Sequence, residues 1–119
     1  MTRRPQEFGQ LLREKRLAKG VGLRAFAELV GVSPTYLSQV EQCNSVPPTA
    51  DRVRRMAELL EENADEWMAV AGRISDDLLE IIRQSPVQIS GLLREVQGMT
   101  EEQLREVREV ARSLRKDNE

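Results

Sequence analysis

The feature that most constrains this chain is a helix-period pattern of apolar residues that glycine, proline and capping residues interrupt at short intervals. No stretch of alternating polar and apolar residues is long enough to indicate a strand. We therefore expect an all-α fold, with a five-helix domain followed by three more helices. The expected helices cover about residues 5–19, 23–30, 34–42, 50–61, 64–71, 76–84, 87–97 and 101 onwards.

Capping residues and apolar spacing predict where these helices begin and which side they bury. Thr49, Ser75 and Ser85 precede helical segments and can accept hydrogen bonds from free amide groups. Thr100 and Gln103 have the spacing of a capping box. The predicted core positions of the first five helices are Phe8, Leu11, Leu12, Leu17, Phe26, Ala27, Val30, Leu37, Val40, Val53, Met56, Ala57, Leu60, Trp67, Met68 and Val70.

The segment 23–42 contains two short helices joined by the turn Gly31-Val32-Ser33. Glycine accepts the left-handed conformation that ends a helix, and the small Ala27 permits a close helix crossing. Leu37 and Val40 would anchor the second helix and leave its polar side exposed. A helix about 10–12 Å in diameter fits a major groove about 12 Å wide. The pattern therefore predicts a helix-turn-helix whose second helix contacts DNA bases.

The stretch LREKRLAKGVGLRAFAELVGVSPTYLSQVE, together with the Pro47-Pro48 loop, resembles the helix-turn-helix of the Cro-repressor/XRE family of bacterial and phage regulators. The resemblance covers about residues 8–71. It implies a DNA-binding regulator, more often a repressor than an activator. The residues that carry it are Arg16, Gly20, Phe26-Ala27, Gly31-Val32-Ser33, the SPTYLSQVE helix and Pro47-Pro48.

The resemblance also implies roles for individual residues. Thr35 and Gln39 match base-contacting positions of the family, and Tyr36 and Ser38 are adjacent to them. Ser33 matches a phosphate contact, at a helix N-terminus that itself favours an anion. An arginine and a glutamate that match Arg16 and Glu41 form an ion pair in the family. Further residues expected near phosphates are Arg24, Lys19, Asn44 and Arg52.

Three positions depart from the family pattern. Leu23 stands where a phosphate-contacting glutamine is common, so Arg24 is expected to supply that contact. Gly22 replaces the usual capping serine or threonine. Cys43 stands where glycine often follows the glutamate, at a cost of about 1 kcal/mol if that residue is left-handed. We expect this lone thiol to be incidental rather than a redox sensor.

The segment 73–119 is predicted to be a helical dimerisation or partner-binding region, separate from a DNA-binding domain at residues 1–72. Residues Leu104, Val107, Ala111 and Leu114 repeat at 3, 4, 3 spacing, which is typical of a helix-pairing seam. We expect self-association here; the alternative is that the segment folds back on its own DNA-binding domain. The expected dimerisation residues are Leu78, Ile82, Leu92, Leu93, Val96, Leu104, Val107, Ala111 and Leu114.

The composition argues against an enzyme and against a metal or cofactor. The chain has no histidine and one cysteine, which removes histidine-based catalysis and histidine metal ligands. The net charge is −2, made up of +2 in residues 1–62 and −4 in residues 63–119. No apolar run reaches the roughly 20 residues of a membrane span, so we expect a cytoplasmic protein.

These observations predict a homodimeric transcriptional repressor that binds a palindromic operator in double-stranded DNA. Two alternatives stay open. One is an antitoxin that regulates its own operon and binds a toxin through the acidic C-terminal segment. The other is a protein-interaction adaptor that has the fold but does not bind DNA. A second protein, either a toxin or an anti-repressor, is a further expected partner.

Overall fold

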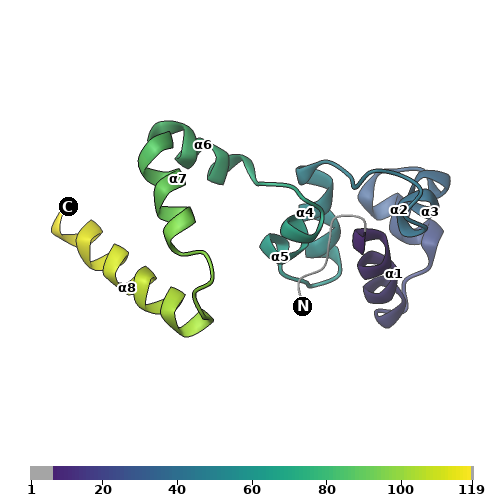
Figure 1. Cartoon of the computed structure of the whole chain (residues 1–119). Helices are drawn as coiled ribbons and strands as arrows, with labels where there is room; N and C mark the ends of the chain where they lie inside the picture. Colours follow the sequence, from purple (N-terminus) through teal and green to yellow (C-terminus); the bar gives the residue numbers. More distant parts are fainter. Residues whose placement is uncertain (1–6, 119) are drawn as a thin grey trace. The chain divides into compact units, whose positions relative to one another are not determined.

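The computed structural model describes residues 7–118, and within that range every regular element is an α-helix. The expected all-α class is therefore confirmed (Figure 1). The helices are α1 Phe8–Ala18, α2 Leu23–Val30, α3 Pro34–Glu41, α4 Ala50–Leu59, α5 Ala64–Val70, α6 Asp76–Gln84, α7 Pro86–Glu95 and α8 Glu101–Asp117. Pro5, which was expected to open the first helix, lies outside the described residues.

The chain divides into two units, one ending at Leu79 and one starting at Glu80. We call them the N-terminal and C-terminal units. The division falls within α6, whereas the expected boundary lies after residue 72. Ser75, just before α6, is only 4% exposed. The separate function of residues 73–119 stays a prediction.

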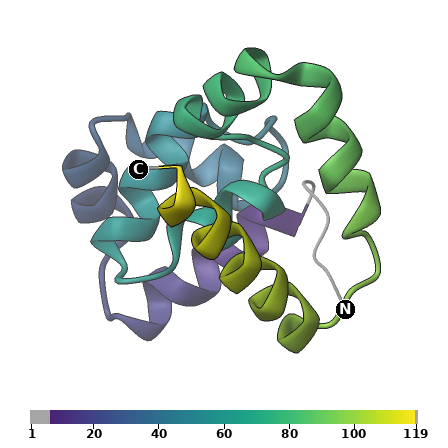
Figure 2. The same ribbon diagram turned by 90° about the vertical axis from the view of Figure 1, so that its left-hand side faces the viewer.

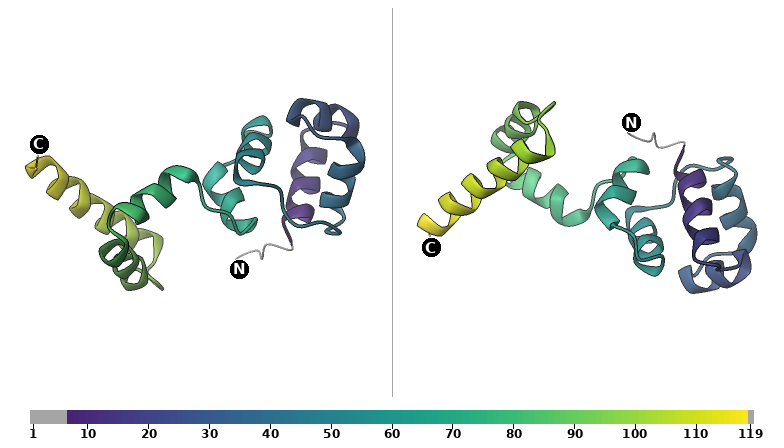
Figure 3. Two further views of the ribbon diagram at one scale, coloured as in Figure 1. Left: turned by 90° about the horizontal axis from the view of Figure 1, so that it is seen from above. Right: turned by 90° about the horizontal axis from the view of Figure 1, so that it is seen from below.

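The N-terminal unit buries an apolar core between α1 and α5. α3 packs against α1 and α2, α2 also packs against α4, and α4 packs against α5 (Figure 3). The rings of Phe8 and Trp67 meet edge to face, with centroids 5.7 Å apart, which joins α1 to α5. The core residues are Phe8, Leu11, Leu12, Phe26, Ala27, Leu37, Val40, Val53, Met56, Ala57, Leu60, Trp67, Met68 and Ala71.

Three of the predicted core positions differ from this set. Leu17 is 56% exposed, so its assignment to the core was wrong. It lies one residue before the end of α1, where the helix no longer has a neighbouring core surface to cover. Val30 and Val70 are partly buried and pack against the edge of the core.

Helix ends follow the capping pattern only in part. Thr100 and Gln103 form the expected capping box of α8. Thr49 and Ser85 occupy the N-cap positions of α4 and α7, but neither side chain accepts a capping hydrogen bond, so these two predictions were wrong in that respect. Asn63 caps α5 through a 2.9 Å bond from the amide of Glu66, which the sequence analysis did not predict.

The C-terminal unit has a different character. α6 and α7 meet at a bend at Ser85, and a turn that contains Gly98 leads into α8 (Figure 2). None of the residues of α6, α7 and α8 is buried. Leu92, Leu93 and Leu114 are about half exposed or more. Within residues 7–118, no helix has the length and apolar character that crossing a membrane requires.

Gly9→Ala is expected to lower the free energy of unfolding by about 1–3 kcal/mol. Gly9 lies on α1 against the end of α3, and an added Cβ would overlap the carbonyl oxygen of Val40 and come within 2.9 Å of Sγ of Cys43. The carbonyl belongs to the backbone, so relief requires the two helices to separate. Urea unfolding followed by circular dichroism measures the change.

Gly91→Ala is the matched control, because an added Cβ there meets nothing within 4 Å. Gly91 lies inside α7, where alanine is favoured over glycine by roughly 0.5–1 kcal/mol, so this variant should be slightly more stable. If Gly9→Ala unfolds at the same or a higher urea concentration than the native protein, α1 and α3 are not in close contact at Gly9.

Candidate nucleic-acid interface

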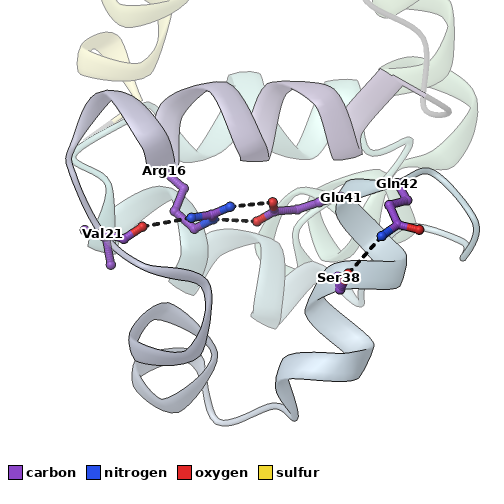
Figure 4. A network of polar contacts seen from close by, with 5 residues as sticks. All are labelled: Arg16, Val21, Ser38, Glu41 and Gln42. Carbon is purple, nitrogen blue, oxygen red and sulfur yellow. Dashed lines mark hydrogen bonds and ion pairs between the residues drawn. The ribbon is translucent and has the colours of Figure 1, made fainter.

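The position of α3 is determined by a buried ion pair with α1 (Figure 4). Nε of Arg16 lies 2.7 Å from one carboxylate oxygen of Glu41, and Nη2 lies 2.8 Å from the other. The two residues are only 7% and 8% exposed. The hydrogen bond to Glu41 is the main cause that raises the pKa of Arg16 above its ordinary value. A two-pronged contact of this kind fixes direction as well as distance.

Arg16 also binds the turn between α1 and α2. Its Nη1 donates a 2.9 Å hydrogen bond to the backbone carbonyl of Val21. The guanidinium of Arg16, which extends from α1, therefore binds both the turn before α2 and the last residue of α3 (Figure 4). Each of the three guanidinium nitrogens donates a hydrogen bond, which offsets part of the cost of burying the charge.

α3 has one buried side and one polar side. Leu37, Val40 and Glu41 are buried, whereas Thr35 and Gln39 are exposed. Ser33 caps the helix by accepting a 3.1 Å hydrogen bond from the amide of Tyr36. Ahead of it, Gly31 has a φ of 89°, the left-handed conformation that was expected to end α2. The capped start and the anchored end hold the polar side rigidly.

Four predicted DNA-contacting residues line one shallow groove of about 260 Å³ between α2 and α3. They are Arg24, Thr35, Ser38 and Gln39. Leu23 lines the same groove and is partly buried against the core, which explains how an apolar residue is accommodated at that position. Arg24 therefore lies beside the polar side of α3, where a DNA phosphate could be bound.

A second groove, of about 210 Å³, contains a basic residue that the sequence analysis missed. Arg13 lines it together with Ser38 and Gln42. The amide of Gln42 donates a 3.0 Å hydrogen bond to the hydroxyl of Ser38 (Figure 4). Arg13 precedes Arg16 by three residues, so both lie on the same side of α1. That spacing was the signal that could have revealed it.

The remaining expected phosphate contacts are not gathered at these grooves. Lys19 forms a 2.9 Å ion pair with Glu61 at the end of α4, and this hydrogen bond lowers the pKa of Glu61. Asn44 donates a hydrogen bond to the side chain of Gln42. The guanidinium of Arg52 lies 5.8 Å from the centre of the Tyr36 ring, within cation–π range.

Cys43 has a φ of 60°, so it adopts the left-handed conformation that costs a non-glycine residue about 1 kcal/mol. Its thiol is free and exposed. Among the described residues, no three histidine, cysteine, aspartate or glutamate side chains come together as a metal site.

The two short helices, the glycine turn and the exposed polar side of α3 define a helix-turn-helix protein. A family model described as a helix-turn-helix domain matches residues 7–67, just over half of the chain. The chain belongs to this family and is a DNA-binding transcription regulator of the helix-turn-helix type. The expected relation to Cro-repressor/XRE helix-turn-helix regulators is confirmed.

No curated protein matches the chain. Several solved structures are similar to it, including the following three. The clp gene regulator ClgR from Corynebacterium glutamicum is 25% identical, with 78% of this chain and 89% of that chain covered and a TM-score of 0.50. An HTH_3 family transcriptional regulator from Vibrio cholerae is 31% identical over 55% of this chain and 36% of that chain, with a TM-score of 0.47. SinR, solved in complex with DNA, is 26% identical over 51% of this chain and 97% of that chain, with a TM-score of 0.48.

Glu41→Gln is expected to lower the free energy of unfolding by about 3 kcal/mol, because it leaves the buried Arg16 guanidinium without its counter-charge. Arg16 keeps its bond to Val21, which should hold the loss near the lower end of the range for broken buried pairs. Replacing both residues by leucine should cost less than this single change. Chemical denaturation of the three proteins measures these differences.

Glu62→Gln is the matched control. Glu62 forms an ion pair with Lys15 between side chains that are 28% and 46% exposed, so its loss should cost less than about 1 kcal/mol. Equal losses for Glu41→Gln and Glu62→Gln would contradict the central role of the Arg16–Glu41 pair.

Proposed function

We propose that the protein is a homodimeric repressor, each copy of which inserts α3 into the major groove at one half of a palindromic operator. The observation that carries this proposal is the two-sided environment of α3. Its buried side is fixed by apolar packing and by the Arg16–Glu41 pair, while Thr35 and Gln39 are exposed. A helix held in this way can present side chains to base edges without disturbing its own domain.

The polar side chains of α3 suit base contacts. The Gln39 amide has a donor and an acceptor, which match N7 and the N6 amino group of adenine. Thr35 has a methyl group and a hydroxyl group for a thymine methyl or a base edge. The Ser38 hydroxyl accepts from Gln42, so its own hydrogen is available to a base acceptor. Tyr36 is held by Arg52 at the edge of this surface.

Phosphate contacts would place α3 in the groove. Ser33 lies at the N-terminus of α3, where free amide groups favour an anion. Arg24 and Arg13 line the two grooves beside α3, and Arg52 lies close to Tyr36. Lys19 and Asn44 already have protein partners, so we assign them smaller contributions. The likeness to the clp gene regulator ClgR supports a regulatory role.

Dimerisation is assigned to residues 73–119. The three helices of this segment, α6, α7 and α8, bury no residue, although all of them carry large apolar side chains. A second copy would cover the same residues on both partners around a two-fold axis. Two α3 helices held about 34 Å apart could then enter successive major grooves, which matches a palindromic operator.

Gln39→Ala and Thr35→Ala should each weaken specific DNA binding by about tenfold or more, since a good base contact contributes roughly 1–3 kcal/mol of discrimination. Operators selected from a random DNA pool, followed by titration at fixed moderate salt, measure the effect. Gln84→Ala, an exposed glutamine of α6, is the control and should bind normally.

If the native protein selects no DNA sequence at any salt concentration, the adaptor alternative is favoured over the regulator. If it selects a motif and both α3 variants bind that motif with native affinity, α3 is not the helix that contacts the bases.

Leu92→Glu should weaken dimer formation by more than about tenfold, because it places a charge in an apolar contact. Sedimentation equilibrium should give twice 13.6 kDa for the native protein and a mass near 13.6 kDa for the variant. Arg94→Glu, also exposed on α7, introduces the same side chain outside the predicted seam and should remain dimeric. A native protein that is monomeric at tens of micromolar would instead favour a segment that folds back on its own DNA-binding domain.

A further inference from the structure

The segment between α5 and α6 is attached to the loop that follows the DNA-contacting helix. Nε of Arg73 donates a 2.9 Å hydrogen bond to the carbonyl oxygen of Pro48, and Nη2 donates a 2.6 Å bond to that of Pro47. The loop 42–49 joins α3 to α4, and Pro48 within it is buried. The Arg73 side chain therefore donates hydrogen bonds to two successive carbonyl groups of this loop.

The backbone conformation at Arg73 is fixed by hydrogen bonds at the end of α5. The Arg73 amide donates a 2.8 Å hydrogen bond to the carbonyl of Met68, while the amide of Gly72 bonds to that of Ala69. Gly72 has a φ of 70°, so these bonds form the Schellman arrangement that ends many helices. The backbone at residue 73 is consequently set before its side chain reaches the loop.

The residue before α6 is buried as well. Ser75 is 4% exposed, and its hydroxyl donates a hydrogen bond to the carboxylate of Asp77, which lowers the pKa of Asp77. The segment that leads into α6 is thus attached to the N-terminal unit through Arg73 and is buried at Ser75.

We infer that Arg73 is a positioning residue. Its hydrogen bonds to Pro47 and Pro48 fix where the dimerising helices leave the DNA-contacting domain. They thereby set how strictly the protein selects the spacing between operator half-sites. This inference rests on the proposed function. A change of one base pair moves a half-site by about 3.4 Å along the axis and turns it by roughly a tenth of a helical turn. A rigid connection between the two parts of the chain prevents the DNA-contacting domain from moving to the displaced half-site. A flexible connection allows this movement.

The first test uses the operator selected by the native protein, with its half-sites moved apart or together by one and two base pairs. The native protein should prefer its optimal spacing over a one-base-pair change by about tenfold or more. Arg73→Ala should reduce this preference to about threefold or less, while its preference for the half-site sequence stays native. Arg73 is exposed, so the variant is expected to remain folded.

Two variants separate positioning from a general loss of structure. Arg73→Lys keeps the charge and one donor group, but it cannot bind two carbonyls in the fixed geometry of a guanidinium, so it should restore only part of the spacing preference. Arg83→Ala removes an exposed arginine of α6 beyond the attached segment and should leave the preference native. An unchanged spacing preference in Arg73→Ala would overturn the inference.

A second test needs no DNA. Spin labels are attached at Glu28→Cys on α2 and Arg94→Cys on α7 in a Cys43→Ser background, and the labelled protein is diluted with unlabelled protein. Dipolar spectroscopy then gives the distribution of distances between the two labels of one chain. The distribution should be broader with Arg73→Ala than with Arg73, and equal widths would overturn the inference. Failure to bind any DNA would reject the proposed function and leave this second test to decide on Arg73.

Discussion

The proposed DNA-contacting surface depends on the Arg16–Glu41 pair. Apolar contacts of Leu37 and Val40 hold α3 in the core, but apolar burial is non-directional and tolerates small rotations of a helix. The two hydrogen bonds from Arg16 to both carboxylate oxygens of Glu41 are directional and do not tolerate such rotations. They fix the rotation of α3 about its axis. The exposure of Thr35 and Gln39 follows from that rotation.

The close crossing of α1 and α3 is the second constraint on the proposed DNA-contacting helix. Gly9 brings the backbone of α1 against the last carbonyls of α3. The chain must leave this contact at once, and Cys43 takes a φ of 60° as it does so. The end of α3 is therefore part of the same packing that anchors it.

The sequence was sufficient to predict where the helices lie in the chain, but not to predict the contacts made at their ends. The bounds of α2 were predicted correctly because the apolar period and Gly31 both mark them. Leu17 was misassigned because the period continues to the end of α1 beyond the core. The Arg73 contacts could not be predicted, since their partners are backbone carbonyls 25 and 26 residues away and carbonyls leave no trace in side-chain patterns.

The two units reach stability by different means, and this links DNA binding to self-association. The N-terminal unit has its own core, whereas α6, α7 and α8 bury no residue. In the proposed dimer, a second copy stabilises the C-terminal helices, so their order depends on protein concentration. Once one half-site is bound, the second α3 acts at a high effective concentration only if its connection holds it near the other half-site. In the proposed dimer, the segment after α5 determines that effective concentration, because it joins the proposed DNA-contacting domain to the proposed dimerising helices.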